Sequence, residues 1–147
     1  MPFTEAYEVP ADTVDAFMAR QRLERVHILK VDVKGHEMAV FEGAGRALSR
    51  RAIDAVFFEF GIHRISSRHF YDLFARHDYD LWVAEAGVLR PIPHYTNEFE
   101  NHSKLHNLYA IRRPESVPQD ATVEPPPLTQ DGNFLEQLRR RFATHQA

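Results

Sequence analysis

The chain has 147 residues, a length typical of one domain. It contains no cysteine, which excludes disulfides, thiolate metal sites and cysteine nucleophiles. The formal net charge of -3 gives no support to binding of nucleic acid or of anionic membranes. No apolar run approaches the ~20 residues of a membrane span, and the N-terminus lacks a signal pattern, so we expect a cytoplasmic protein.

The first half of the chain predicts a helix, a strand and a second helix. Apolar residues recur at helical spacing over residues 13–23, and Asp12 or Thr13 can cap this first helix. Residues 26–33 are rich in β-branched side chains and predict a buried strand interrupted by two charges. Residues 36–50 return to helical spacing and predict one further helix.

The same alternation continues in the next part of the chain. A second strand is expected at residues 54–60, a helix near 66–77, and two more strands at 79–83 and 107–111. The order predicts an α/β fold with a mostly parallel sheet flanked by helices. The polar stretch 85–104 is either a functional flap or a hairpin.

Composition divides the chain into three parts. Residues 1–112 carry the α/β pattern, and residues 113–130 form a Pro-rich linker with five prolines. Residues 131–147 predict an amphipathic tail helix, which we expect to dock on its own domain or on a sister chain.

Charged residues lie at the ends of the first two predicted strands. Lys30 and Asp32 share one strand face and stand near its carboxyl end, where α/β sheets place their ligand crevice. Gly35 permits a sharp turn, and Glu37 falls in the first turn of the next helix, where the dipole stabilises a carboxylate. Glu59 ends the second strand, which suggests one shared crevice. In the alternative interpretation, Lys30 pairs with Glu59 and Glu37 merely caps the helix.

Four segments together resemble the FkbM family of methyltransferases. They are Thr13-Val-Asp-Ala-Phe17, Ile28-Leu-Lys-Val-Asp-Val-Lys-Gly-His-Glu37, Gly43-Ala44 and Phe57-Phe-Glu-Phe-Gly61. The resemblance covers about residues 10–112 and implies a class I, Rossmann-like fold. It also implies S-adenosylmethionine as methyl donor and a hydroxyl of a small molecule or sugar as acceptor. No glycine-rich turn follows any predicted strand, so the chain corresponds to the C-terminal half of the family's domain.

The resemblance also implies roles for individual residues. The expected catalytic residues are Asp32, His36, Glu37 and Glu59. The expected cofactor contacts are Lys30, Asp32 and Gly35, and the expected substrate contacts are Tyr95 and Phe99. His36 has two interpretations, a base toward the acceptor hydroxyl or a plain contact at the helix N-terminus. Lys34 stands where acidic residues or glutamine are frequent in the family. Nine histidines are present without an H-E-x-x-H pattern, and no metal site is predicted.

Two functions follow from these observations. The first is a methyltransferase that uses S-adenosylmethionine and acts on oxygen, with Asp32 beside the methyl group or the acceptor hydroxyl. The second is a truncated, catalytically silent module. In the family's strand order, the strand over residues 27–33 lies beside a first strand that this chain lacks, so one edge stays open. We expect the N-terminal segment, the tail helix or another copy of the chain to cover that edge.

Overall fold

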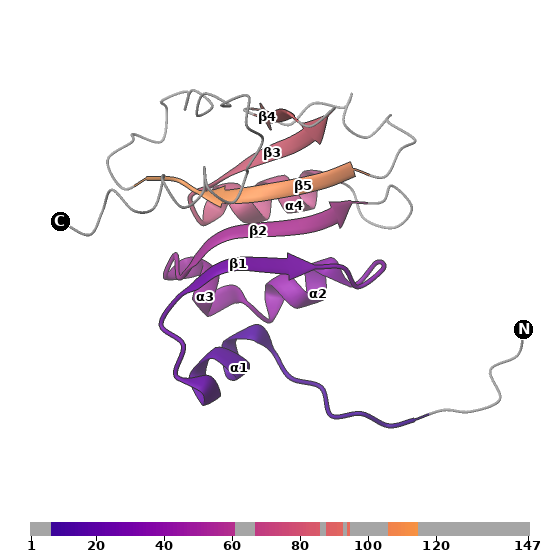
Figure 1. Cartoon of the computed structure of the whole chain (residues 1–147), viewed down its shortest axis with the longest axis vertical. Helices are drawn as coiled ribbons and strands as arrows, with labels where there is room; N and C mark the ends of the chain where they lie inside the picture. Colours follow the sequence, from indigo (N-terminus) through magenta and orange to yellow (C-terminus); the bar gives the residue numbers. More distant parts are fainter. Residues whose placement is uncertain (1–6, 61–66, 86–87, 93, 95–105, 115–147) are drawn as a thin grey trace, which may run out of the picture.

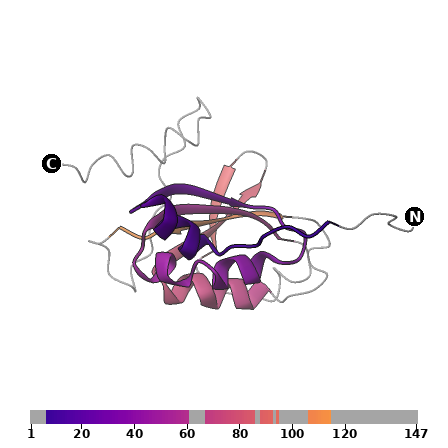
Figure 2. The same ribbon diagram turned by 90° about the horizontal axis from the view of Figure 1, so that it is seen from below.

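A mixed five-stranded sheet carries three of the helices on one of its faces (Figures 1 and 2). The computed structural model describes residues 7–60, 67–85, 88–92, 94 and 106–114. In chain order the elements are α1 (Val14–Gln21), β1 (Val26–Val31), α2 (Glu37–Glu42), α3 (Gly45–Ser49), β2 (Ile53–Phe60), α4 (Ser67–Arg76), β3 (Tyr79–Glu85), β4 (Val88–Ile92) and β5 (His106–Arg112). The expected α/β class is confirmed. The linker after Pro114, the tail helix and both expected substrate contacts, Tyr95 and Phe99, lie outside the described residues.

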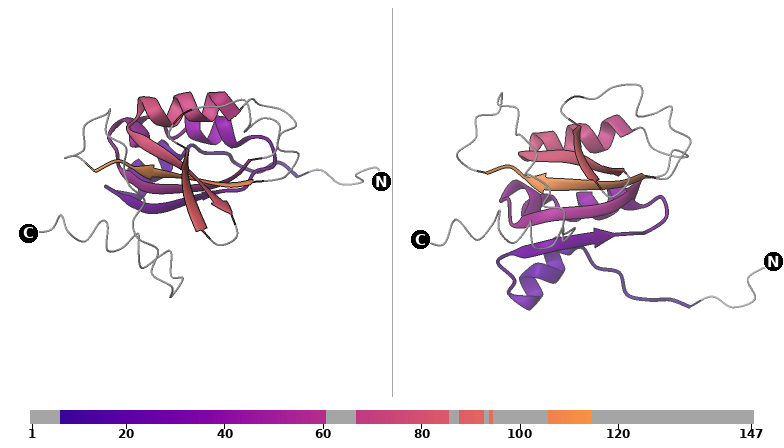
Figure 3. Two further views of the ribbon diagram at one scale, coloured as in Figure 1. Left: turned by 90° about the horizontal axis from the view of Figure 1, so that it is seen from above. Right: turned by 45° about the horizontal axis from the view of Figure 1, so that its top comes forward.

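The sheet order is β1-β2-β5-β3-β4, and only β1 and β2 pair in parallel. The other three pairings are antiparallel, so the prediction of a mostly parallel sheet is wrong. Two features explain the difference. The last strand, β5, inserts between β2 and β3 in the opposite direction, and β4 folds back on β3 as a hairpin within the polar stretch (Figure 3). The strands β1, β2 and β3 nevertheless run in one direction.

The helix expected over residues 36–50 is two short helices, because α1 packs against the break between them. Thr13 caps α1 by accepting a hydrogen bond from the N–H of Ala16. The Asp15 carboxylate accepts hydrogen bonds from the N–H groups of Arg46 (2.8 Å) and Ala47 (2.9 Å), which begin α3. At Gly43 a Cβ atom would lie 3.2 Å from the Thr13 side chain, so a larger residue here requires Thr13 to move by a few tenths of an ångström.

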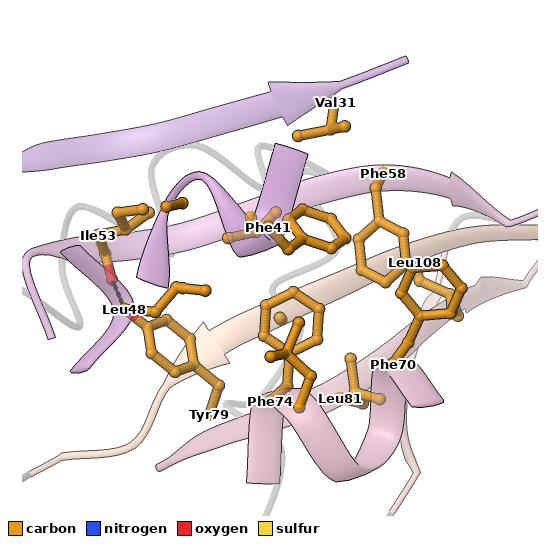
Figure 4. Packing of buried hydrophobic residues seen from close by; sticks show 14 of the residues in the cluster. Val31, Phe41, Leu48, Ile53, Phe58, Phe70, Phe74, Tyr79, Leu81 and Leu108 are labelled. Atoms are coloured by element: carbon orange, nitrogen blue, oxygen red, sulfur yellow. Dashed lines mark hydrogen bonds between the residues drawn. The ribbon is translucent and has the colours of Figure 1, made fainter. Parts of the chain in front are cut away.

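Aromatic rings fill the core between the sheet and its helices (Figure 4). Phe41 of α2 meets the rings of Phe58 and Phe74 edge-on, with centroids 5.2 Å and 5.1 Å apart. Such edge-to-face pairs add to the stabilisation that burial of apolar area provides. Tyr79 lies at the margin of this core, and its hydroxyl donates a hydrogen bond to the Ile53 carbonyl over 2.5 Å.

The first strand is more exposed than its sequence predicts. Within β1 only Val31 is fully buried, whereas Ile28 is 41% exposed. The prediction of a buried strand is therefore wrong here. The physical reason is position, because β1 is the end strand of the sheet order and α2, α3 and α4 all lie on one sheet face. Lys30 and Asp32 thus keep contact with water, with side chains 63% and 41% exposed.

A buried carboxylate, that of Asp54, lies near the start of β2, at the opposite end of this strand from Glu59. Asp54 is fully buried, and Arg25 holds it with three hydrogen bonds of 2.6–2.9 Å. His27 Nδ1 lies 2.8 Å from the same carboxylate, and Arg112 Nε lies 3.4 Å away. A buried charge needs such partners to offset its lost hydration. This cluster therefore fixes the amino ends of β1 and β2, away from the charged turn that the sequence singled out.

Candidate functional site

A sharp turn leads from β1 to α2 and carries the charged residues of interest. Lys34 has φ 52° and Gly35 has φ 98°, two successive residues with positive φ. Glycine adopts such values without steric cost, whereas an L-residue such as Lys34 does so less often. The sharp turn expected at Gly35 is present, and it brings the Lys34 side chain toward the end of β2.

Lys34 joins the ends of the two parallel strands. Its Nζ lies 3.0 Å from Asp32 Oδ1, just after β1, and 2.5 Å from Glu59 Oε2, within β2. Lys30 Nζ lies 3.7 Å from the other oxygen of Asp32. The pairing that the sequence suggested between Lys30 and Glu59 is therefore replaced by one between Lys34 and Glu59. Four charged side chains, Lys30, Asp32, Lys34 and Glu59, form what we call the strand-end cluster.

The charges in this cluster stabilise one another. The hydrogen bond from Lys34 lowers the pKa of Asp32, and the positive charges of Lys34 and Lys30 act in the same direction. In turn, hydrogen bonds to Glu59 and Asp32 raise the pKa of Lys34. Asp32 and Lys34 are therefore both ionised at neutral pH. The carboxylate of Asp32 is suited to accept hydrogen bonds or to hold a cation, more than to take up a proton.

Glu37 has a different place in the turn. It is buried at the start of α2, and its Oε2 accepts a hydrogen bond from the N–H of Gly35 over 3.0 Å. This bond closes the turn, but the Gly35 N–H lies before the N-cap residue His36, so Glu37 satisfies no free N–H of α2 through it. His36 is the N-cap residue of α2; it is exposed and makes no side-chain cap hydrogen bond. The structure thus brings Lys30, Asp32 and Glu59 together and gives Glu37 a contact with the turn backbone.

Sequence reasoning gave no role to Lys34, although it lies at the centre of the cluster. The signal that could have found it is its position on a glycine turn between two strands that both end in carboxylates. A cation there reaches both negative charges. Among the residues that the structure describes, no group of His, Asp or Glu is arranged to hold a metal ion.

A concave region lies on another part of the molecule, away from the strand-end cluster. A groove of about 1030 Å³ lies where α1 meets α3, and its described lining includes Met18, Arg22, Arg46 and Ser49. The expected site residues are absent from that lining. No helix in the described part of the chain is both long and apolar enough to cross a membrane.

The fold and the turn define an α/β protein with charged side chains gathered where two parallel strands end, the usual place for a ligand in such sheets. Comparison with protein families matches residues 2–81 to the methyltransferase FkbM domain. The chain belongs to this family, and the resemblance seen in the sequence is confirmed. The matched region includes the strand-end cluster, His36 and Glu37. Searches of curated proteins and of solved structures find no match to the chain.

Proposed function

We propose that the chain is a methyltransferase that uses S-adenosylmethionine and acts on a hydroxyl oxygen of a small molecule or sugar. The observation that carries the proposal is the strand-end cluster, which lies on the charged turn of an FkbM-family domain. The common direction of β1, β2 and β3 further supports a Rossmann-like arrangement with its ligand edge at this cluster.

The residues at this edge fit the chemistry of the cofactor. S-adenosylmethionine carries a sulfonium cation, an amino group and ribose hydroxyls. Carboxylates attract the sulfonium cation and accept hydrogen bonds from the amino group and the hydroxyls. Asp32 and Glu59 supply two such carboxylates with 41% and 28% exposed side chains, and Gly35 presents a backbone without a side chain. When bound, the cofactor supplies an electrophilic methyl group.

The chain's own residues then have distinct tasks. Methyl transfer is a displacement that depends chiefly on alignment of the two reactants. Asp32, held ionised by Lys34, attracts the sulfonium cation of the cofactor and so lies beside the methyl group. His36 Nε2 or Nδ1 takes up the hydroxyl proton, because the imidazole is exposed and adjacent to the turn. Glu37 keeps the turn in shape through the N–H of Gly35.

Isothermal titration with S-adenosylmethionine and S-adenosylhomocysteine tests the proposal. We expect micromolar binding, about -8 kcal/mol, and at least a roughly tenfold loss of affinity in Asp32→Asn. Asp72→Asn is a matched control, because Asp72 is an exposed aspartate that pairs with Arg68 on α4. Absence of binding up to millimolar ligand, with a folded protein, would contradict the proposal. Mass-spectrometric detection of methylated products among hydroxylated small molecules and sugars then identifies the acceptor.

A second function, a catalytically silent association module, is favoured by two observations. Lys34 occupies both carboxylates of the cluster, and no described strand pairs with the outer edge of β1. Titration separates the two functions, since a silent module leaves both ligands unbound at millimolar concentration.

A further inference from the structure

The outer edge of β1 has backbone groups that no described strand satisfies. Within the described part of the chain, β1 pairs with β2 alone. The N–H of Val26 donates to the Ala52 carbonyl over 2.8 Å, so the backbone groups of Val26 face β2. Because these groups alternate in direction along a strand, those of His27, Leu29 and Val31 point away from the sheet. They form a row of donors and acceptors open to another strand.

This edge has only part of the protection that is common at the edges of sheets, because β1 carries the exposed Lys30 but no proline. At the other end of the sheet order, β4 contains Pro91 and the exposed Arg90, and both residue types discourage strand addition. The large hydrophobic residues that the described chain exposes are all among its first 33 residues, in α1, β1 or the segments beside them. They are Tyr7, Val9, Phe17, Leu23, Ile28 and Val33.

We propose that the partner of this edge is a second copy of the chain, whose β1 pairs antiparallel with the first across a two-fold axis at Val31. The proposal is independent of methyl transfer. It joins two five-stranded sheets edge to edge. The backbone N–H and C=O of Val31 point away from β2, so they can form both hydrogen bonds with Val31 of the second copy.

The charge pattern selects this register. A two-fold axis perpendicular to the sheet at one residue places the residues at equal distances before and after it opposite one another. An axis at Lys30 sets two lysines face to face, and an axis at Leu29 sets Lys30 against Ile28. An axis at Val31 sets Lys30 against Asp32 of the second copy, and the reverse pair forms by symmetry. Opposite charges directly across a strand pair stabilise it, whereas like charges destabilise it.

The same register covers an exposed apolar side chain. Leu29 then lies opposite Val33 of the second copy, which is 39% exposed in the single chain. Leu29 and Val31 lie on the same strand face and pack on the core, and Val33 follows at the same parity, two residues beyond the end of β1. Contact between Leu29 and Val33 removes apolar surface from water, which adds to the two charge pairs.

Analytical ultracentrifugation of the full chain tests the inference through a charge swap. We expect a reversible dimer at micromolar to tens of micromolar concentration. Lys30→Glu places a glutamate opposite Asp32 twice, and Asp32→Lys places a lysine opposite Lys30 twice, so each should raise the dimer dissociation constant at least about tenfold. The double variant K30E/D32K restores opposite charges and should return the constant to within about threefold of the wild type. Arg76→Glu, an exposed reversal at the end of α4, should leave it unchanged.

Hydrogen exchange of the wild-type chain gives a second readout that needs no variant. The amides of Leu29 and Val31 should exchange more slowly at high protein concentration than at low concentration. A chain that stays monomeric at all concentrations would overturn the inference, whether its edge pairs within the chain or stays unpaired. So would a dimer that ignores both single reversals, or one that K30E/D32K fails to restore while circular dichroism shows folded protein.

Discussion

Lys34 Nζ donates a hydrogen bond to Glu59 Oε2 and thereby ties the turn after β1 to the end of β2. The two residues are 25 positions apart in sequence, and the parallel pairing of their strands brings them together. The same amine lies 3.0 Å from Asp32. One lysine therefore contacts both carboxylates at the candidate site and lowers the pKa of Asp32.

Removal of this amine should change the acidity of Asp32. In Lys34→Met we expect the pKa of Asp32 to rise toward its ordinary value of 3.8, because the hydrogen bond that lowers it is lost. The lowered pKa contributes stability above pH 3.8, and that contribution fades as the pH falls through the folded-state pKa. The variant should therefore lose less stability than the wild type on acidification below pH 4. Carboxyl-carbon NMR titration and urea unfolding at several pH values measure both effects.

Lys30→Met serves as the matched comparison for this prediction. Lys30 lies 3.7 Å from Asp32, farther than Lys34, so its loss should shift the pKa of Asp32 by a smaller amount. An Asp32 titration that is unchanged in Lys34→Met would show that the cluster does not persist in solution.

Local patterns predicted most elements, and tertiary position decided what they failed to predict. The spacing around Thr13, the strand near Asp54 and the turn at Gly35 all depend on neighbouring residues, and each is present. Strand direction depends on β5, which is distant in sequence, so the alternating order suggested the wrong pairing. Likewise the apolar run of β1 cannot reveal that it stands at the end of the sheet order.

The candidate site shows the same limit. Residue types pointed to Asp32 and Glu59, because charges on apolar strands are unusual. Which cation reaches them depends on the positive φ of Lys34, a value that sequence seldom predicts for a residue other than glycine. Contacts with Tyr95 and Phe99 remain predictions.

Asp15 should be important for stability although it lies far from the candidate site. Its carboxylate satisfies the free N–H groups of Arg46 and Ala47 at the start of α3, 31 and 32 residues away. Asp15→Ala should lower the free energy of unfolding by about 1–2 kcal/mol, the usual cost of a lost N-cap. Urea unfolding measures it, with Asp72→Ala on the exposed face of α4 as control. Equal stability of the two variants would contradict the link between α1 and α3.

The buried carboxylate of Asp54 should be more sensitive to substitution. Asp54→Ala leaves Arg112, whose side chain is only 18% exposed, without this partner and removes the bidentate contact of Arg25. We expect a loss of about 3–5 kcal/mol, as for other broken buried ion pairs. Glu59→Gln should cost about 1 kcal/mol or less, because Lys34 is well exposed. Thermal and urea unfolding of both variants make the comparison, and similar losses would contradict the assignment of Asp54 as the structural charge.

Tyr79 should make the protein sensitive to alkaline pH. Burial raises the pKa of its hydroxyl to about 12, while an unfolded tyrosine ionises near 10. The neutral hydroxyl therefore contributes stability that is complete below pH 10 and is lost as the pH rises through 12, up to about 2–3 kcal/mol. In Tyr79→Phe the fall in unfolding free energy between pH 10 and 12 should be smaller than in the wild type. In Tyr79→Phe the absorbance titration near 295 nm should also lack the tyrosinate that forms at the highest pH.

Tyr109→Phe is the control, because Tyr109 is only partly buried and its pKa is raised by burial alone. If the last-forming tyrosinate disappears in Tyr109→Phe and persists in Tyr79→Phe, burial does not hold the Tyr79 hydroxyl neutral.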